Sequence, residues 1–284
     1  MMNALLTALL ASGASFVIGL VQRDATTTGF YYWGFSLSAQ AVFVLVTNLQ
    51  GVLFPVLTKL NGDLQRQFSA VERACRLLLS VAAPMCVLQY LLAAPFITLL
   101  FQERWQPAIG VAQWISLGLL CQPLYLVATS VLMARGQFRR LAAITGLSAV
   151  ATMLAAGAGA MLGDQLVIAR CVGLSLLAAN TIAGWMVYQE FDRSWTHLWR
   201  AVAPILGMTA ALAVFGEWMN RATANHGGLG QILLTTFAGL LFYGTLMKFF
   251  LPDVVADIIR RITHRREQPV ARPSSGDDTS EIWP

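Results

Sequence analysis

Long apolar stretches alternate with short polar segments along nearly the whole chain. A helix needs about 20 apolar residues to cross the hydrocarbon core of a bilayer, and eight stretches meet this length. The predicted spans are Ala4–Val21, Phe30–Val56, Leu77–Ala94, Ala108–Ala134, Leu141–Leu162, Leu166–Tyr188, Ala201–Trp218 and Leu229–Leu251. No connection between them is long enough for a separate soluble domain. The pattern therefore predicts an all-α, polytopic membrane helix bundle.

Composition and charge agree with this interpretation. Of the 284 residues, 57% are hydrophobic and 12% are charged, whereas a soluble domain carries about 25% charged residues. The net charge is +5, but the basic residues stand in clusters between apolar stretches, so nucleic acid is not an expected partner. With eight spans, 15 of the 19 Lys and Arg residues fall on one side of the membrane. The positive-inside rule makes that side, and both termini, cytoplasmic.

The second predicted span leaves the membrane through the segment VLFPVLTKLNGDLQRQF, residues Val52–Phe68. Pro55 removes one backbone donor there, so it either bends or ends the helix, or acts as a hinge; the sequence leaves these possibilities open. The tail from Arg260 is first basic and then rich in Pro, Ser and Asp. We expect its basic half to lie against anionic membrane lipid and its end to be disordered.

Catalytic groups are scarce. The histidines His197, His226 and His264 fall in predicted loops or in the tail, and the cysteines lack metal-binding spacing. The sequence has no HExxH motif, no GxSxG motif, no paired carboxylates and no glycine-rich phosphate loop. We therefore expect a protein that is not an enzyme, with no catalytic residues, no metal and no cofactor.

Polar residues inside the spans are the candidate functional residues. The first span carries small or polar residues at steps of three and four, and the second carries a similar stripe. They are Ser12, Ser15, Gly19 and Gln22 in the first span, and Ser36, Gln40, Thr47, Asn48 and Gly51 in the second. Such residues either join helices or line a polar cavity, because facing lipid is costly. The larger amides of Gln40 and Asn48 favour the cavity, with Ser36 and Thr47 as minor lining.

Arg170 is the one charged residue that lies well within a predicted span. It stands about one turn from the outer end, so its side chain could extend to the membrane interface. The functional alternative is a cation that faces the cavity and attracts a phosphate.

Three segments resemble motifs of bacterial polysaccharide flippases. They are GFYYWGFSLSAQAVFVLVTNLQGVLFPVLTKL (Gly29–Leu60), LLFQERWQPAIGVAQWIS (Leu99–Ser116) and MARGQFRRL (Met133–Leu141). In this order they are similar to the polysaccharide transporter branch of the multidrug/oligosaccharidyl-lipid/polysaccharide superfamily, over nearly residues 1–250. The chain departs from the family at Gln102, where glycine is usual, and lacks the arginine that some members carry in the second helix.

The resemblance implies a flippase lobe. Residues 1–189 would form the second six-helix lobe, residues 200–251 two additional membrane helices, and residues 252–284 a cytoplasmic tail. The family moves undecaprenyl-diphosphate-linked oligosaccharide across the bacterial inner membrane for exopolysaccharide or O-antigen biosynthesis. The first lobe would be missing, so we expect a truncated chain, with a split transporter or a homodimer of half-transporters as alternatives.

Two other functions remain open at this stage. One is a related drug or lipid-precursor exporter of the same superfamily. The other is a membrane-embedded polysaccharide polymerase or ligase, which usually presents a large outer loop with catalytic Arg or His residues. The longest outer connection here, around Pro95–Pro107, is short and offers only Glu103 and Arg104.

Overall fold

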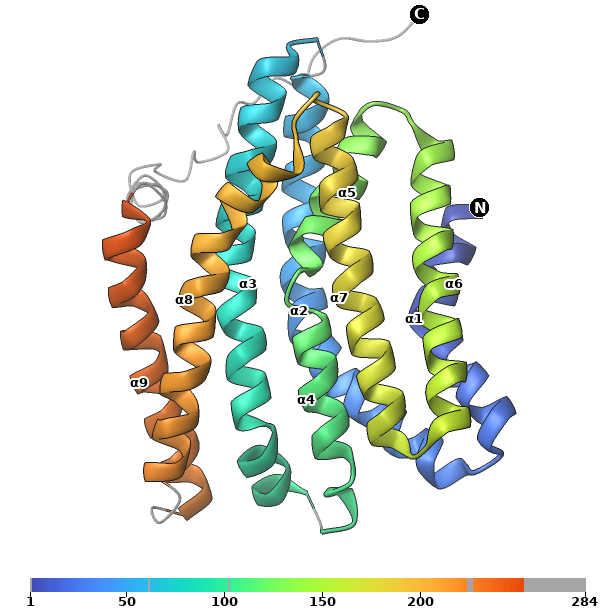
Figure 1. The fold of residues 1–284 in the computed structure, drawn as a ribbon, viewed down its shortest axis with the longest axis vertical. Coiled ribbons are helices and arrows are strands. Elements are labelled where there is room, and N and C mark those ends of the chain that lie inside the picture. Colours follow the sequence, from blue (N-terminus) through green and yellow to red (C-terminus); the bar gives the residue numbers. More distant parts are fainter. Residues whose placement is uncertain (1, 61, 102, 224–226, 253–284) are drawn as a thin grey trace, which may run out of the picture.

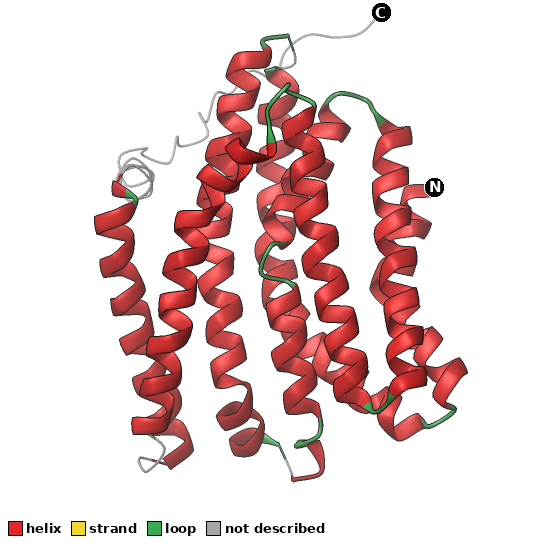
Figure 2. Cartoon of the chain, in the orientation of Figure 1, coloured by secondary structure: helices red, strands yellow, loops and turns green. Residues whose placement is uncertain are grey.

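The computed structural model describes residues 2–60, 62–101, 103–223 and 227–252 of the chain, and no side chain among residues 2–11, 41, 45–47, 49, 50, 52 and 227. Within these ranges the chain is helical and has no strand, as Figure 2 shows. The helices are α1 (Met2–Gln22), α2 (Ala25–Lys59), α3 (Leu64–Leu100), the 3₁₀ helix η1 (Glu103–Trp105), α4 (Ala108–Gly118), α5 (Gln122–Ala134), α6 (Phe138–Leu162), α7 (Gln165–Gln189), α8 (Trp195–Ala222) and α9 (Gly227–Phe250). The expectations for the tail fall outside the described residues.

The helices run side by side, and their connections gather at the two ends of the bundle (Figure 1). The pair α1 and α6 forms one edge, α9 forms the opposite edge, and α8 lies between α9 and α3. In the middle, α2 packs against α4 and α5, and α7 packs against α4, α5 and α6. Both α8 and α9 contact α3, which is how the two helices predicted as additional join the rest.

The predicted all-α membrane bundle is confirmed. Five helices, α3, α6, α7, α8 and α9, are long and apolar enough to cross a bilayer, and α4 with α5 makes a sixth if the bent pair is one span. Each of the eight predicted stretches overlaps helix in the structure, and Ala108–Ala134 covers two helices, α4 and α5. Whether α1 and α2 cross the membrane stays a prediction. Neither is among the five helices, and within the described residues α1 contributes only a shorter apolar helix, Ser12–Gln22.

The prediction of one continuous helix over Ala108–Ala134 was wrong. The helix breaks between Gly118 and Gln122, and its two halves are bent by 48°. Pro123, in the first turn of α5, explains the break, because proline lacks a backbone donor and disfavours a helical residue before it. By contrast, Pro55 lies inside α2, which continues to Lys59.

Capping residues mark where the helices begin and end. Asp24 caps α2 by accepting hydrogen bonds from the backbone N–H groups of Thr26 and Thr27, at 3.0 and 3.1 Å. These bonds and the one from the Thr27 hydroxyl lower the pKa of the Asp24 carboxyl. Gly136 ends α5 with a φ of 69°, a left-handed conformation that glycine adopts without strain.

A close backbone contact joins α4 to α7 through two glycines. A Cβ atom at Gly173 would lie 2.5 Å from the carbonyl oxygen of Trp114, and one at Gly118 would lie 2.6 Å from the carbonyl oxygen of Gly173. Small residues let membrane helices approach closely enough for their backbones to touch. These glycines therefore set the distance between the bent α4–α5 pair and α7.

We predict that Gly173→Ala destabilises the protein by about 2 kcal/mol, because the added methyl group must force two backbones apart. Gly207→Ala in α8 is the matched control, since no atom outside its own helix turn lies within 4 Å of the new Cβ atom. The measurement is the thermal unfolding midpoint of the purified protein in detergent. Equal midpoints for the two variants would contradict the close approach.

Candidate functional site

Helix α2 has two different faces. One face is buried: Tyr31, Ser38 and Val42 lie against the neighbouring helices, and the Ser38 hydroxyl donates to the carbonyl oxygen of Ala112 in α4, at 2.8 Å. The other face is exposed and carries Gln40, Val44, Asn48 and Gly51, at steps of three or four residues. No described helix covers this outward face of α2.

Two of the four predicted lining residues of α2 lie on that outward face. The side chains of Gln40 and Asn48 are exposed, and Ser36 is half-buried. Asn48 donates one hydrogen bond to the carbonyl oxygen of Val44, one turn earlier in the same helix, at 2.7 Å. The side chain of Thr47 lies outside the described residues.

The residues of the polar stripe on α1 lie in two environments, one exposed and one in contact with α6. Gly19 and Ser12 are exposed, and no atom outside the helix approaches Gly19 within 4 Å. Gln22 instead donates to the carbonyl oxygens of Ala160 and Gly163, at the end of α6. This amide therefore joins α1 to α6.

Arg170 does not come together with the residues of α2. Its exposed guanidinium lies over the ring of Trp114, 5.5 Å from the ring centre. Trp114 lines an apolar groove with residues of α7 and α8, whereas α4 meets α2 through Ala112 and Val111. In this structure Arg170 therefore makes a cation–π contact with Trp114, which lines an apolar groove.

A second polar cluster ties several helix ends together at the Arg-rich end of the bundle. The buried side chain of Gln67, in α3, accepts hydrogen bonds from Nε and Nη2 of Arg135, at 3.1 and 2.9 Å. Arg135 also donates to the backbone carbonyl of Glu190, after α7, at 3.3 Å, and lies 3.5 Å from its carboxylate. Gln67 in turn donates to the carbonyl oxygen of Leu57 in α2, at 3.2 Å.

This cluster is a junction that holds four helix ends together. It connects the exit of α2, the start of α3, the turn after α5 and the end of α7, and its arginine side chain is 11% exposed. Burial lowers the pKa of the Arg135 guanidinium, and the neighbouring Glu190 carboxylate acts in the opposite direction. The sequence did not reveal that Gln67, Arg135 and Glu190 contact one another, although Arg135 stands in the MARGQFRRL segment.

Within the residues that the structure describes, no three His, Cys, Asp or Glu side chains gather closely enough to hold a metal ion. The outward face of α2 offers amide and backbone groups, which bind hydroxyl-rich or charged head groups by hydrogen bonds. Together the fold and this face define a multi-pass helical membrane protein with a polar stripe on its second helix.

A known protein family matches the first part of the chain. Residues 1–110, which include α1, α2 and α3, match the polysaccharide biosynthesis protein family. The resemblance predicted from the sequence is therefore confirmed over this part of the chain. The match supports a role in polysaccharide biosynthesis. No curated protein matches the chain.

We predict that Arg135→Ala destabilises the purified protein by about 2 kcal/mol, because it leaves the side-chain oxygen of the buried Gln67 without its donors. Arg66→Ala is the control, since Arg66 forms an ion pair with Asp63 while its side chain is 79% exposed, and such pairs contribute little. Thermal unfolding in detergent measures both variants. A smaller loss for Arg135→Ala than for Arg66→Ala would contradict the junction.

Proposed function

We propose that this chain is part of a flippase that moves undecaprenyl-diphosphate-linked oligosaccharide across the bacterial inner membrane for exopolysaccharide or O-antigen biosynthesis. The observation that carries the proposal is the outward face of α2, where Gln40 and Asn48 are exposed on a helix that is predicted to span the membrane. Polar groups on such a helix must meet other polar groups or water, because facing hydrocarbon is costly. The family match over residues 1–110 supplies the link to polysaccharide.

The proposed mechanism follows from what the substrate demands. A sugar head group with two phosphates cannot enter hydrocarbon unpaired, whereas its lipid tail can stay in the bilayer. The outward face of α2, with the exposed part of α1, would form one wall of the polar path taken by the head group. In this arrangement the protein acts as a transporter and not as an enzyme, and the sugars are held by hydrogen bonds.

Orientation is part of the same proposal. The ends of α2, α5 and α7 meet at the junction around Arg135, so the basic loops that follow them lie on one side. The positive-inside rule assigns that side to the cytoplasm, with both termini there. The lipid-linked oligosaccharide would then enter at the Arg-rich end and leave at the end where Asp24 and Asp164 cap α2 and α7.

We predict that the double variant Gln40→Leu, Asn48→Leu inserts into the membrane normally but lowers polymer export about tenfold or more. Leucine is favourable in a membrane helix, whereas the lost amides are worth about 1 kcal/mol or more for each hydrogen bond to the head group. The measurement is surface polysaccharide in a strain that depends on this chain, together with the lipid-linked intermediate that accumulates inside.

The matched control is Val44→Leu, which lies between the two amides on the same exposed face and changes size without changing polarity. We expect export close to that of the unchanged protein. Normal export by a stably inserted double variant would remove Gln40 and Asn48 from the path. Loss of an unrelated drug-efflux activity in its place would favour an exporter of another substrate.

A further inference from the structure

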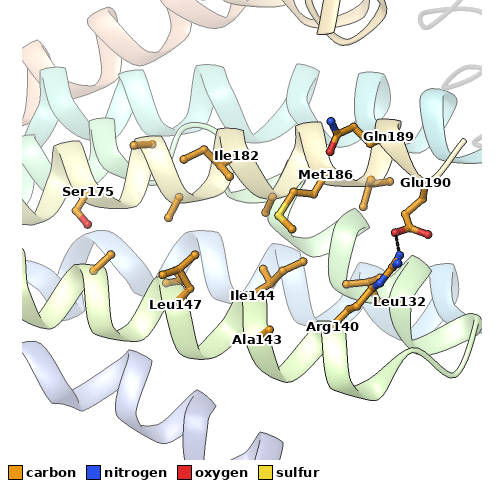
Figure 3. Close-up of a pocket in the computed structure, with 16 residues that line it drawn as sticks. Leu132, Arg140, Ala143, Ile144, Leu147, Ser175, Ile182, Met186, Gln189 and Glu190 are labelled. Carbon is orange, nitrogen blue, oxygen red and sulfur yellow. Dashed lines mark hydrogen bonds and ion pairs between the residues drawn. The ribbon is translucent and has the colours of Figure 1, made fainter. Parts of the chain in front are cut away.

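A groove of about 700 Å³ lies between α6 and α7, away from the outward face of α2. Figure 3 shows Ile144 and Leu147 of α6 and Met186 of α7 directed between the two helices. Leu132 of α5 forms part of its floor. The walls are mainly apolar, and Leu147 and Ile182 remain 68% and 47% exposed. In the described part of the chain no other helix covers these side chains.

The groove ends at a charged pair. Arg140, at the start of α6, pairs with the carboxylate of Glu190 after α7, as the dashed line in Figure 3 marks. The Arg140 side chain is 62% exposed, and its described hydrogen bonds, to Glu190 and Gln137, use only Nη1. Among the described contacts, Nε and Nη2 of Arg140 make no hydrogen bond. An exposed guanidinium can bind a phosphate through two parallel bonds.

Positive charges outnumber negative charges around this end of the groove. Glu190 is shared between two arginines, because Arg135 lies 3.5 Å from its other oxygen. Arg139 adds an exposed cation next to Arg140 in the sequence. An anion is thus attracted to the end of a groove whose remaining walls suit a hydrocarbon chain. Basic pockets between membrane helices bind the head groups of anionic lipids in this way.

We propose that this groove binds one anionic phospholipid, with an acyl chain between α6 and α7 and its phosphate on Arg140. A lipid would need both the apolar walls and a cation at one end of the groove, and this groove has both. A bound chain would support α6, and α1 packs on the far side of α6. The site is separate from the substrate path and does not depend on which oligosaccharide is moved.

The test is native mass spectrometry of the purified full chain, titrated with dioleoylphosphatidylglycerol or dioleoylphosphatidylcholine. We expect one retained phosphatidylglycerol and weaker retention of phosphatidylcholine. Arg140→Gln should weaken phosphatidylglycerol binding about tenfold, the effect of losing a charge-assisted hydrogen bond. Ala143→Phe should also weaken it, because the ring fills the groove without changing charge.

Two further variants separate lipid binding from a structural ion pair. Glu190→Gln removes the carboxylate that competes with the phosphate, so binding should be at least as tight as in the unchanged protein. Arg221→Gln is the matched control, because Arg221 forms an exposed ion pair with Glu217 at the opposite end. It should leave lipid binding unchanged. If Arg140→Gln fails to fold, Glu190→Gln and Ala143→Phe still test whether the groove binds the lipid.

Several results would overturn the proposal. Equal binding of phosphatidylglycerol and phosphatidylcholine would remove the role of charge. Equal phosphatidylglycerol binding by Arg140→Gln and Arg221→Gln would remove Arg140 from the site. Binding of glycerol phosphate as tight as that of the intact lipid would show a free phosphate site without an acyl chain. Unchanged binding by Ala143→Phe would place the lipid elsewhere.

Discussion

A polar group that enters hydrocarbon must carry its hydrogen-bond partner with it, and this constraint orders the whole bundle. The buried hydroxyl of Ser38 donates to the Ala112 carbonyl oxygen, and the buried amide of Asn180 lies 3.4 Å from the Gly118 carbonyl oxygen. Gln113 likewise donates to the carbonyl oxygen of Tyr90, at 3.3 Å. Each of these side chains uses a backbone acceptor on a neighbouring helix. Polar residues thus fix which helices are neighbours and how they are rotated.

The outward face of α2 differs from these contacts, because no other described helix offers its polar side chains an acceptor. Gln40 lies on a face that no described helix covers, and Asn48 turns part of its amide back to its own helix. A membrane protein that kept such a face toward lipid would be destabilised. The face therefore calls for water, for a polar head group or for further protein. The first possibilities agree with the proposed transport of a lipid-linked oligosaccharide.

The same constraint explains what could be predicted from the sequence. Apolar length predicted the helices well, because a continuous apolar segment can satisfy its own backbone groups in a bilayer only as a helix. It failed at Leu119–Cys121, where Pro123 breaks the helix inside an unbroken apolar stretch. Residues such as Gln40 could be assigned to a polar stripe by their spacing alone. Whether a stripe faces a neighbour or open space depends on packing, as Gln22 and its bonds to α6 show.

Contacts between distant segments could not be predicted from the sequence. Gln67 and Arg135 meet across 68 positions, and Arg135 and Glu190 across 55, with no periodic pattern to connect them. The approach of Gly118 to Gly173 is of the same kind, since glycine alone does not reveal its partner. The sequence singled out Arg170 as a charge within a predicted span, but its position over Trp114 follows from the way α4 and α7 pack.

The central claim is that the outward face of α2 meets water within the membrane. In a background without native cysteines, Gln40→Cys and Asn48→Cys can be treated in intact membranes with a membrane-impermeant thiol reagent. Leu154→Cys on α6 serves as the lipid-facing reference, because Leu154 is apolar and 69% exposed. Labelling of both α2 positions much faster than of the reference is the predicted result. Labelling of all three at the same slow rate would contradict the account.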